Sequence, residues 1–199
     1  MPERIPIHQR SYETEAFDEG HGRMRVRGRL IDNKPQGLCL ADGSDLVIHD
    51  MRIDLLVDPE TFTIVAVENE MMVRPYSHCE AILPNYQALV GVSITRGYTS
   101  QIKKLFGGPN GCSHMGALLQ AMGPVAVQAT WSLVNLHKSP ESRLDNSEDP
   151  EEQERRLRLN TNSCHVWQED GEHIELIKKG EWVLPDWESE RLRSLGVEF

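Results

Sequence analysis

The chain has 199 residues, of which 39% are hydrophobic and 26% charged, and its formal net charge at pH 7 is −10. This composition is typical of a soluble globular protein with a sizeable core. An acidic chain is a poor partner for nucleic acid or an anionic membrane surface, so we expect neither. A small neutral or cationic molecule, or another protein, is the expected partner.

We expect a cytoplasmic protein. No stretch approaches the roughly 20 consecutive apolar residues of a membrane span, and residues 1–8 lack the apolar centre of a signal peptide. In such a chain free thiols or metal ligands are expected rather than disulfides. The cysteines are far apart and form no CxxC pair: Cys39, Cys79, Cys112 and Cys164.

Residues 1–45 are expected to form an N-terminal arm and an edge strand. Residues 1–21 are polar and contain prolines, which favours an arm lying across the domain. From Arg23 to Ile31 basic and apolar residues alternate, which is the period of a strand with one solvated face. The arginines could bind anions, but we favour the simpler interpretation of a solvated face.

Residues 46–138 are expected to form the core. Residues 46–57 and 62–73 alternate Val, Ile and Leu with polar residues, which predicts an antiparallel hairpin with one buried face. Two short helices, over residues 79–90 and 99–106, should end at glycines.

A longer helix is expected to begin behind His114 and to kink or split at Gly123-Pro124. The acidic residues 139–160 predict a linker or a solvated helix. Residues 161–199 predict a hairpin around Asp170-Gly171, formed by residues 163–168 and 172–178, and a short helix packed on the core. The exposed core hairpin and the C-terminal tryptophans lead us to expect a homo-oligomer.

The most informative stretch is residues 107–114, Gly-Gly-Pro-Asn-Gly-Cys-Ser-His. Cys112 and His114 would diverge on a regular helix. They converge if Cys112 lies in the turn and Ser113 caps the helix, which also places the thiol at the positive end of the helix dipole. The stretch is either half of a metal site or a Gly-rich helix start whose Cys and His are simply packed.

Other ligand-type residues stand at the ends of the core elements. An antiparallel hairpin with helices on one face would bring these ends together at one edge of the sheet. Two imidazoles and two thiolates suit zinc or iron(II). Four bound donors would make a closed structural site, whereas three would leave an open position for catalysis. The expected metal ligands are His49, Cys79, Cys112 and His114.

The order hairpin, His78-Cys79, two short helices and Cys112-Ser113-His114-Met115 resembles the NifU/SufE-type iron–sulfur scaffold fold over residues 46–137. The resemblance implies an α+β fold, an antiparallel sheet with helices packed on one face, to which the C-terminal hairpin would be added. It implies ligands at His49 or Asp50, at Cys79, and at Cys112 with His114. A cluster scaffold needs three thiolates, and a His or Asp replaces the first one here, which favours a mononuclear ion.

Three short segments also resemble an uncharacterised bacterial domain family, a domain of unknown function marked by a Gly-Cys-Thr/Ser-His signature. The resemblance extends upstream to His8-Gln9-Arg10 and Asp32-Asn33-Lys34, so it spans most of the chain. It implies no established chemistry. The segments that carry it are Ile48-His49-Asp50-Met51, Pro75-Tyr76-Ser77-His78-Cys79 and Gly111-Cys112-Ser113-His114-Met115.

We expect a metal-dependent enzyme, with Zn²⁺ or alternatively Fe²⁺, acting on a small organic molecule, for which aromatic compounds are candidates. A Lewis-acid ion would assist deprotonation and bond cleavage, as in a lyase, with a hydrolase close behind. One alternative is an iron–sulfur or metal delivery protein. Another is a structural zinc domain for protein interaction, which would unfold when its site is opened. The candidates for proton transfer are Tyr76, His78, Asp50 and Tyr98.

Overall fold

The computed structural model describes residues 4–35, 37–95, 97–139, 150–181 and 185–196. The chain divides into two compact units, Met1–Val134 and Asn135–Phe199. The first unit therefore includes the N-terminal segment together with the expected core, and each unit is described by itself below.

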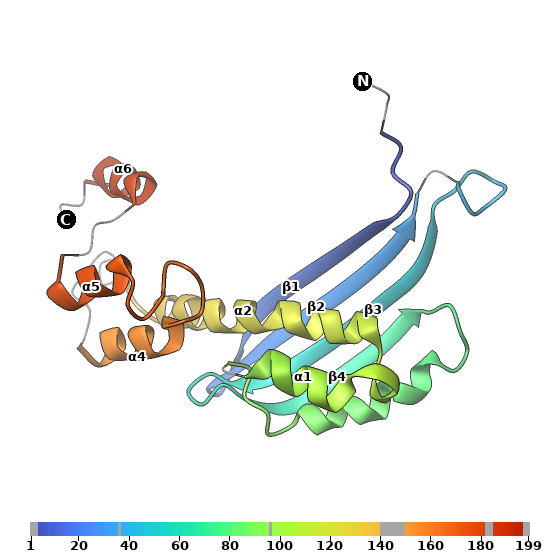
Figure 1. Ribbon diagram of the computed structural model, residues 1–199, viewed down its shortest axis with the longest axis horizontal. Helices are drawn as coiled ribbons and strands as arrows, with labels where there is room; N and C mark the ends of the chain where they lie inside the picture. Colours follow the sequence, from blue (N-terminus) through green and yellow to red (C-terminus); the bar gives the residue numbers. More distant parts are fainter. Residues whose placement is uncertain (1–3, 36, 96, 140–149, 182–184, 197–199) are drawn as a thin grey trace. The chain divides into compact units, whose positions relative to one another are not determined.

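The first unit contains a four-stranded antiparallel sheet whose strands lie in sequence order (Figure 1). The strands are β1 (Gln9–Gly20), β2 (Arg23–Lys34), β3 (Leu46–Asp58) and β4 (Thr63–Val73). The expected α+β class and the expected core hairpin, β3 with β4, are confirmed. The segment expected to be an arm is instead the edge strand β1, because its polar residues pair along the whole length of β2.

The two faces of β2 differ in chemistry because neighbouring side chains on a strand point to opposite sides. Met24, Val26 and Leu30 are buried on one face. On the other face the arginines are held in ion pairs rather than left to bind anions. These pairs are Arg23 with Asp58, Arg25 with Glu19, Arg27 with Asp54, and Arg29 with Asp50.

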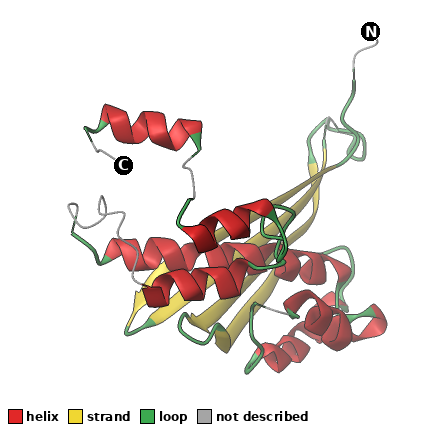
Figure 2. Ribbon diagram, turned by 60° about the vertical axis from the view of Figure 1, so that its left-hand side comes forward, coloured by secondary structure: helices red, strands yellow, loops and turns green. Residues whose placement is uncertain are grey.

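Helical segments cover one face of the sheet (Figures 1 and 2). They are η1 (Cys79–Leu89), α1 (Tyr98–Phe106), η2 (Gly108–Asn110) and α2 (Ser113–Leu136). The short helices agree with those expected from the sequence. The expected split of the long helix at Pro124 does not occur, because α2 runs on through that residue.

Helix α2 supplies much of the helical side of the core. By length and composition it could cross a membrane. Its buried residues nevertheless recur at helical spacing and form the inner stripe of a core helix: Met115, Leu118, Leu119, Met122, Gly123, Ala126 and Thr130. Gly28 of β2 allows this close approach, because a Cβ atom there would lie 2.6 Å from Sδ of Met122.

The second unit is helical in its described part, so the expected C-terminal hairpin is wrong. Its helices are α4 (Pro150–Asn160), α5 (Glu172–Lys179) and α6 (Asp186–Ser194). Gly171 is the N-cap of α5, and Ile174 and Ile177 are buried three residues apart. The Asp170-Gly171 pair therefore starts a helix rather than turning a hairpin.

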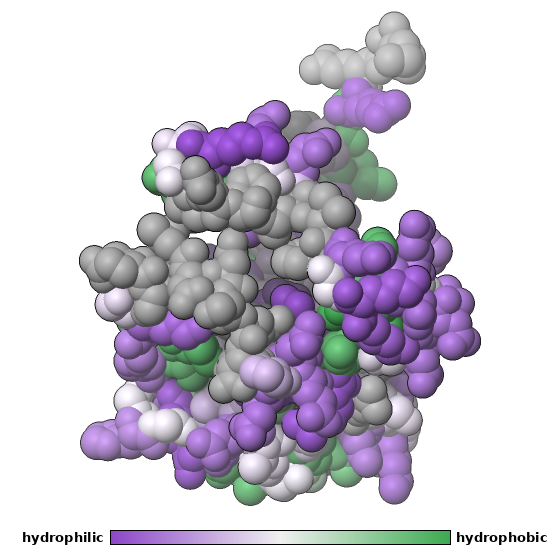
Figure 3. Space-filling view, turned by 90° about the vertical axis from the view of Figure 1, so that its left-hand side faces the viewer, coloured by the Kyte–Doolittle hydropathy of each residue, from purple (hydrophilic) through white to green (hydrophobic). Residues whose placement is uncertain are grey.

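The expected linker over residues 139–160 is helical from Pro150 onward, and residues 140–149 lie outside the described part. On the side of the molecule seen in Figure 3, the described surface is mostly hydrophilic, with small separate hydrophobic areas. This agrees with the 26% of charged residues in the chain.

Candidate metal centre

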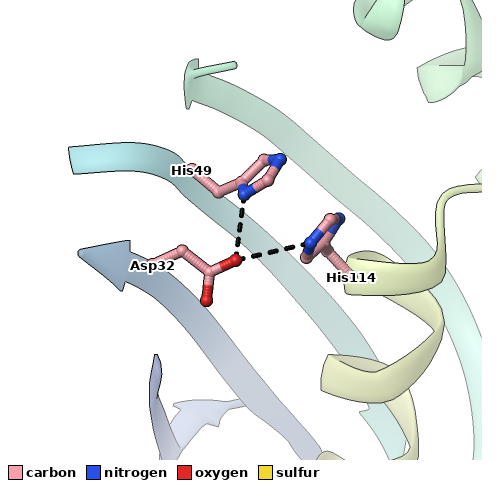
Figure 4. Close-up of side chains that lie close together, drawn as sticks. All are labelled: Asp32, His49 and His114. Carbon is pink, nitrogen blue, oxygen red and sulfur yellow. Dashed lines mark hydrogen bonds and ion pairs between the residues drawn. The ribbon is translucent and has the colours of Figure 1, made fainter. Parts of the chain in front are cut away.

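Three potential ligands meet where β2, β3 and α2 come together (Figure 4). Asp32 of β2 and His49 of β3 are direct partners in the antiparallel register, so their side chains lie on the same face. His114 reaches them from the first turn of α2. One ligand atom from each of the three residues lies within 4.8 Å of the other two.

Two of the three separations between these donors are close to those of ligands around one ion. Oδ2 of Asp32 is 2.9 Å from Nδ1 of His49 and 3.4 Å from Nε2 of His114. Metal–donor bonds of about 2.0–2.2 Å place neighbouring donors roughly 3.0–3.5 Å apart. The two imidazoles also lie against each other, with ring centroids 3.8 Å apart. The arrangement fits a small divalent cation.

Asp32 is a permanently charged carboxylate at the centre of this group. Its side chain is only 1% exposed, and Arg10 binds both of its oxygens, with Nη2 2.7 Å from Oδ2. His8 lies on the same side, with Nε2 3.4 Å from Oδ1. The hydrogen bond from Arg10, followed by that from His49, holds the pKa of Asp32 well below its usual range. Asp32 therefore stays available as an anionic ligand.

The two ring nitrogens of His114 face different partners. Nε2 faces Asp32, while Nδ1 lies 3.6 Å from Sγ of Cys112. Burial, together with the nearby His49 and Arg10, lowers the pKa of His114. A neutral imidazole is the form that binds metal, so this shift favours the ligand state.

Tyr86 supports the loop that carries Cys112. It is fully buried, and its hydroxyl accepts a hydrogen bond of 2.9 Å from the backbone N–H of Cys112. Burial raises the pKa of Tyr86 to about 12, so the phenol stays neutral. The carbonyl of Cys112 accepts the first helical bond, from the N–H of Gly116, so Cys112 is the N-cap of α2. Cys112 lies before the helix as expected, but the expected cap, Ser113, is instead the first helical residue.

The structure brings together some of the ligands predicted from the sequence. His49 and His114 belong to the group, and Cys112 contacts His114. Cys79, the first residue of η1, is outside the group of donors within 4.8 Å in the described part of the chain. All four cysteines are free, in agreement with the prediction against disulfides.

The predicted proton-transfer residues do not join this group. Asp50 is next to His49 on β3, so it points to the opposite face, where it pairs with Arg29. Tyr76 is 72% exposed, and the exposed His78 has its Nδ1 3.3 Å from the Ser77 hydroxyl. Tyr98 is buried at the start of α1, and its hydroxyl has no hydrogen-bond partner among the residues that the structure describes.

The sequence analysis missed Asp32, Arg10 and His8 as parts of the centre. The available signal was the alternation of β2, in which Asp32 continues the buried series of Met24, Val26 and Leu30. A charged residue on the apolar face of a strand is a candidate functional residue. The strand expected from the sequence ended at Ile31, just before Asp32. Asp32 was therefore assigned to a turn rather than to the buried face of the strand.

The chain belongs to the family described as Protein of unknown function (DUF2889), which matches residues 8–128. This confirms the expected membership of a domain family of unknown function. The matched segment contains every residue of the centre described above, from His8 to His114. No curated protein and no solved structure matches the chain.

Proposed function

We propose that Asp32, His49 and His114 bind one divalent ion, zinc or iron(II), and that the chain is a metal-dependent enzyme. Its substrate would be a small organic molecule and its reaction that of a lyase, with a hydrolase as the closest alternative. The observation that carries the proposal is one carboxylate and two imidazoles at ligand spacing, with distances of 2.9 and 3.4 Å from a single oxygen.

This donor set differs from the one expected from the sequence, because a carboxylate replaces the two thiolates. Cys112 lies at Nδ1 of His114, and the two ring nitrogens point away from each other. An ion at Nε2 would therefore lie on the far side of the ring from Cys112. Cys112 is better suited to orient the imidazole, as partners of metal-bound histidines do.

The donor set also bears on the two alternative functions. Oxygen and nitrogen donors favour a mononuclear ion over an iron–sulfur cluster, which needs thiolates. The likeness to the NifU/SufE fold stays a prediction. A closed structural zinc site would need a fourth protein donor, whereas the three donors here leave a position for substrate or water.

The neighbouring residues would supply the remaining chemistry. A bound ion would polarise a carbonyl or hydroxyl group of the substrate. His8 is 39% exposed and lies beside Asp32, so it is placed to move a proton between substrate and solvent. Arg10 would fix the orientation of Asp32. A cytoplasmic location and a homo-oligomer remain parts of this proposal.

Metal analysis of the purified protein tests the proposal. We expect close to one equivalent of zinc or iron in the wild type and in Asp50→Asn, whose side chain lies on the opposite face. Asp32→Asn and His114→Ala should lose the ion while keeping the circular dichroism spectrum of the wild type. A metal-free wild type that also binds no added zinc or iron(II) would refute the proposal, and unfolding of both variants would favour the structural zinc alternative.

A further inference from the structure

The residues around Asp32 carry more positive than negative charge. Arg10 already neutralises Asp32 through hydrogen bonds to both oxygens. Asp32 is the one carboxylate in the group of close donors in the described part of the chain. The imidazoles of His8, His49 and His114 add no negative charge. A divalent ion would therefore leave the centre with about two uncompensated positive charges.

The acidic residues of β3 and of the segment before it, within the described part of the chain, do not correct this imbalance. Asp50 and Asp54 of β3 point to the opposite face of the sheet and are paired with Arg29 and Arg27. Asp45 accepts a hydrogen bond of 2.8 Å from the side chain of Asn33 at the exposed end of the strands. A bound anionic ligand would supply this missing negative charge.

The accessible side of the centre offers donors for an anion. The Arg10 side chain is 34% exposed, and a guanidinium has five N–H donors, of which Nε and one N–H of Nη2 are used on Asp32. His8 is exposed beside it. His114 lies in the first turn of α2, where the helix dipole adds positive potential.

We propose that the centre binds a small carboxylic acid as its carboxylate, with one oxygen on the metal ion and the other hydrogen-bonded to Arg10. The inference rests on the proposed metal site and names its class of substrate. A carboxylate fits because one of its oxygens can bind the ion while the other accepts a charge-assisted hydrogen bond from an N–H of Arg10 that is not used on Asp32. Its single negative charge also halves the excess positive charge at the ion.

Cobalt(II) in place of the native ion gives a direct test, since its visible absorption reports on ligand exchange. We expect the cobalt-loaded full chain to bind benzoate with a saturable spectral change, and the neutral isostere benzamide to bind at least about tenfold more weakly. Equal responses to the two compounds, or none to benzoate, would overturn the inference even though the metal site exists. Failure to bind cobalt, zinc and iron(II) at all would show instead that the proposed function is wrong.

Variants locate the anion contact. Arg10→Gln should bind cobalt but lose benzoate affinity by about tenfold or more, and Arg10→Lys should recover part of the loss. Arg29→Gln removes an arginine from the opposite face and should leave benzoate affinity unchanged. Unchanged affinity in Arg10→Gln would contradict the assigned contact. If Arg10→Gln does not fold, the comparison of benzoate with benzamide in the wild type still tests whether the centre prefers a carboxylate.

Discussion

Asp32 and His49 face each other across β2 and β3, and Nδ1 of His49 lies 2.9 Å from Oδ2 of Asp32. The register of two adjacent strands thus fixes two of the three candidate ligands. Because both residues stand on the face covered by α2, the first turn of this helix can add the third, His114.

Replacing Asp32 should make the free energy of unfolding depend less on pH in the acid range. The pKa of Asp32 is lowered in the fold, chiefly by Arg10, so its ionised form stabilises the native state above about pH 4, where the unfolded chain is also ionised. As the pH falls further, the unfolded chain takes up the proton first and this stabilisation is lost. We expect Asp32→Asn to cost about 1–3 kcal/mol at pH 7 and less at pH 3.

Urea unfolding of the wild type and Asp32→Asn at pH 7, 5 and 3 measures this difference. Asp170→Asn, at an exposed position, serves as the control. A gap between wild type and Asp32→Asn that widens toward pH 3 would have the wrong sign and would show that Asp32 is not held as a carboxylate.

Changing Cys112 and Cys79 distinguishes the ligand set with two thiolates, predicted from the sequence, from the set with one carboxylate and two imidazoles, proposed from the structure. If Cys112 orients His114, Cys112→Ser should retain the ion with an affinity lowered by about 10- to 100-fold, and Cys79→Ser should leave it unchanged. Competition with a chromophoric zinc chelator measures these affinities. Complete loss of metal in Cys79→Ser would restore the set with two thiolates that was predicted from the sequence.

The sequence predicted the core hairpin, the short helices and the placement of Cys112 before α2, because each depends on a local period or on turn residues. It did not predict β1, whose polar residues become a strand only through pairing with β2. It also missed Asp32, since recognising this residue requires the end of β2 and its register with His49. Pairing and register are relations between distant segments, which no local pattern contains. The place of Asp32 on the buried face, by contrast, could have been found by extending the alternation of β2.

Enlarging Gly28 should weaken the contact between β2 and α2. A Cβ atom at this position would lie 2.6 Å from Sδ of Met122 and 3.0 Å from Cδ1 of Leu118. Met122 can shift in part, so we expect Gly28→Val to lower the free energy of unfolding by about 1–3 kcal/mol. Gly116 of α2 has open space where a Cβ atom would lie, so Gly116→Ala should instead stabilise by about 0.5–1 kcal/mol. Equal midpoints in urea for Gly28→Val and the wild type would contradict this packing.

Two buried tyrosines should respond in opposite ways to the loss of their hydroxyl groups. Tyr86→Phe removes the acceptor of the Cys112 N–H and leaves that N–H without its present partner, so we expect a loss of about 1–3 kcal/mol and weaker metal binding. The hydroxyl of Tyr98 is buried and has no hydrogen-bond partner in the described part of the chain, so Tyr98→Phe should be neutral or stabilising.

Thermal unfolding and zinc affinity of the two variants, measured side by side, check these expectations. Because the substitutions remove the same atom from the same kind of side chain, the comparison isolates the hydrogen bond to the loop that carries Cys112 and His114. A Tyr98→Phe variant with lost activity but unchanged stability and metal content would return Tyr98 to the catalytic role first expected from the sequence. A Tyr86→Phe variant as stable and as tight in zinc binding as the wild type would show that the loop is positioned without this bond.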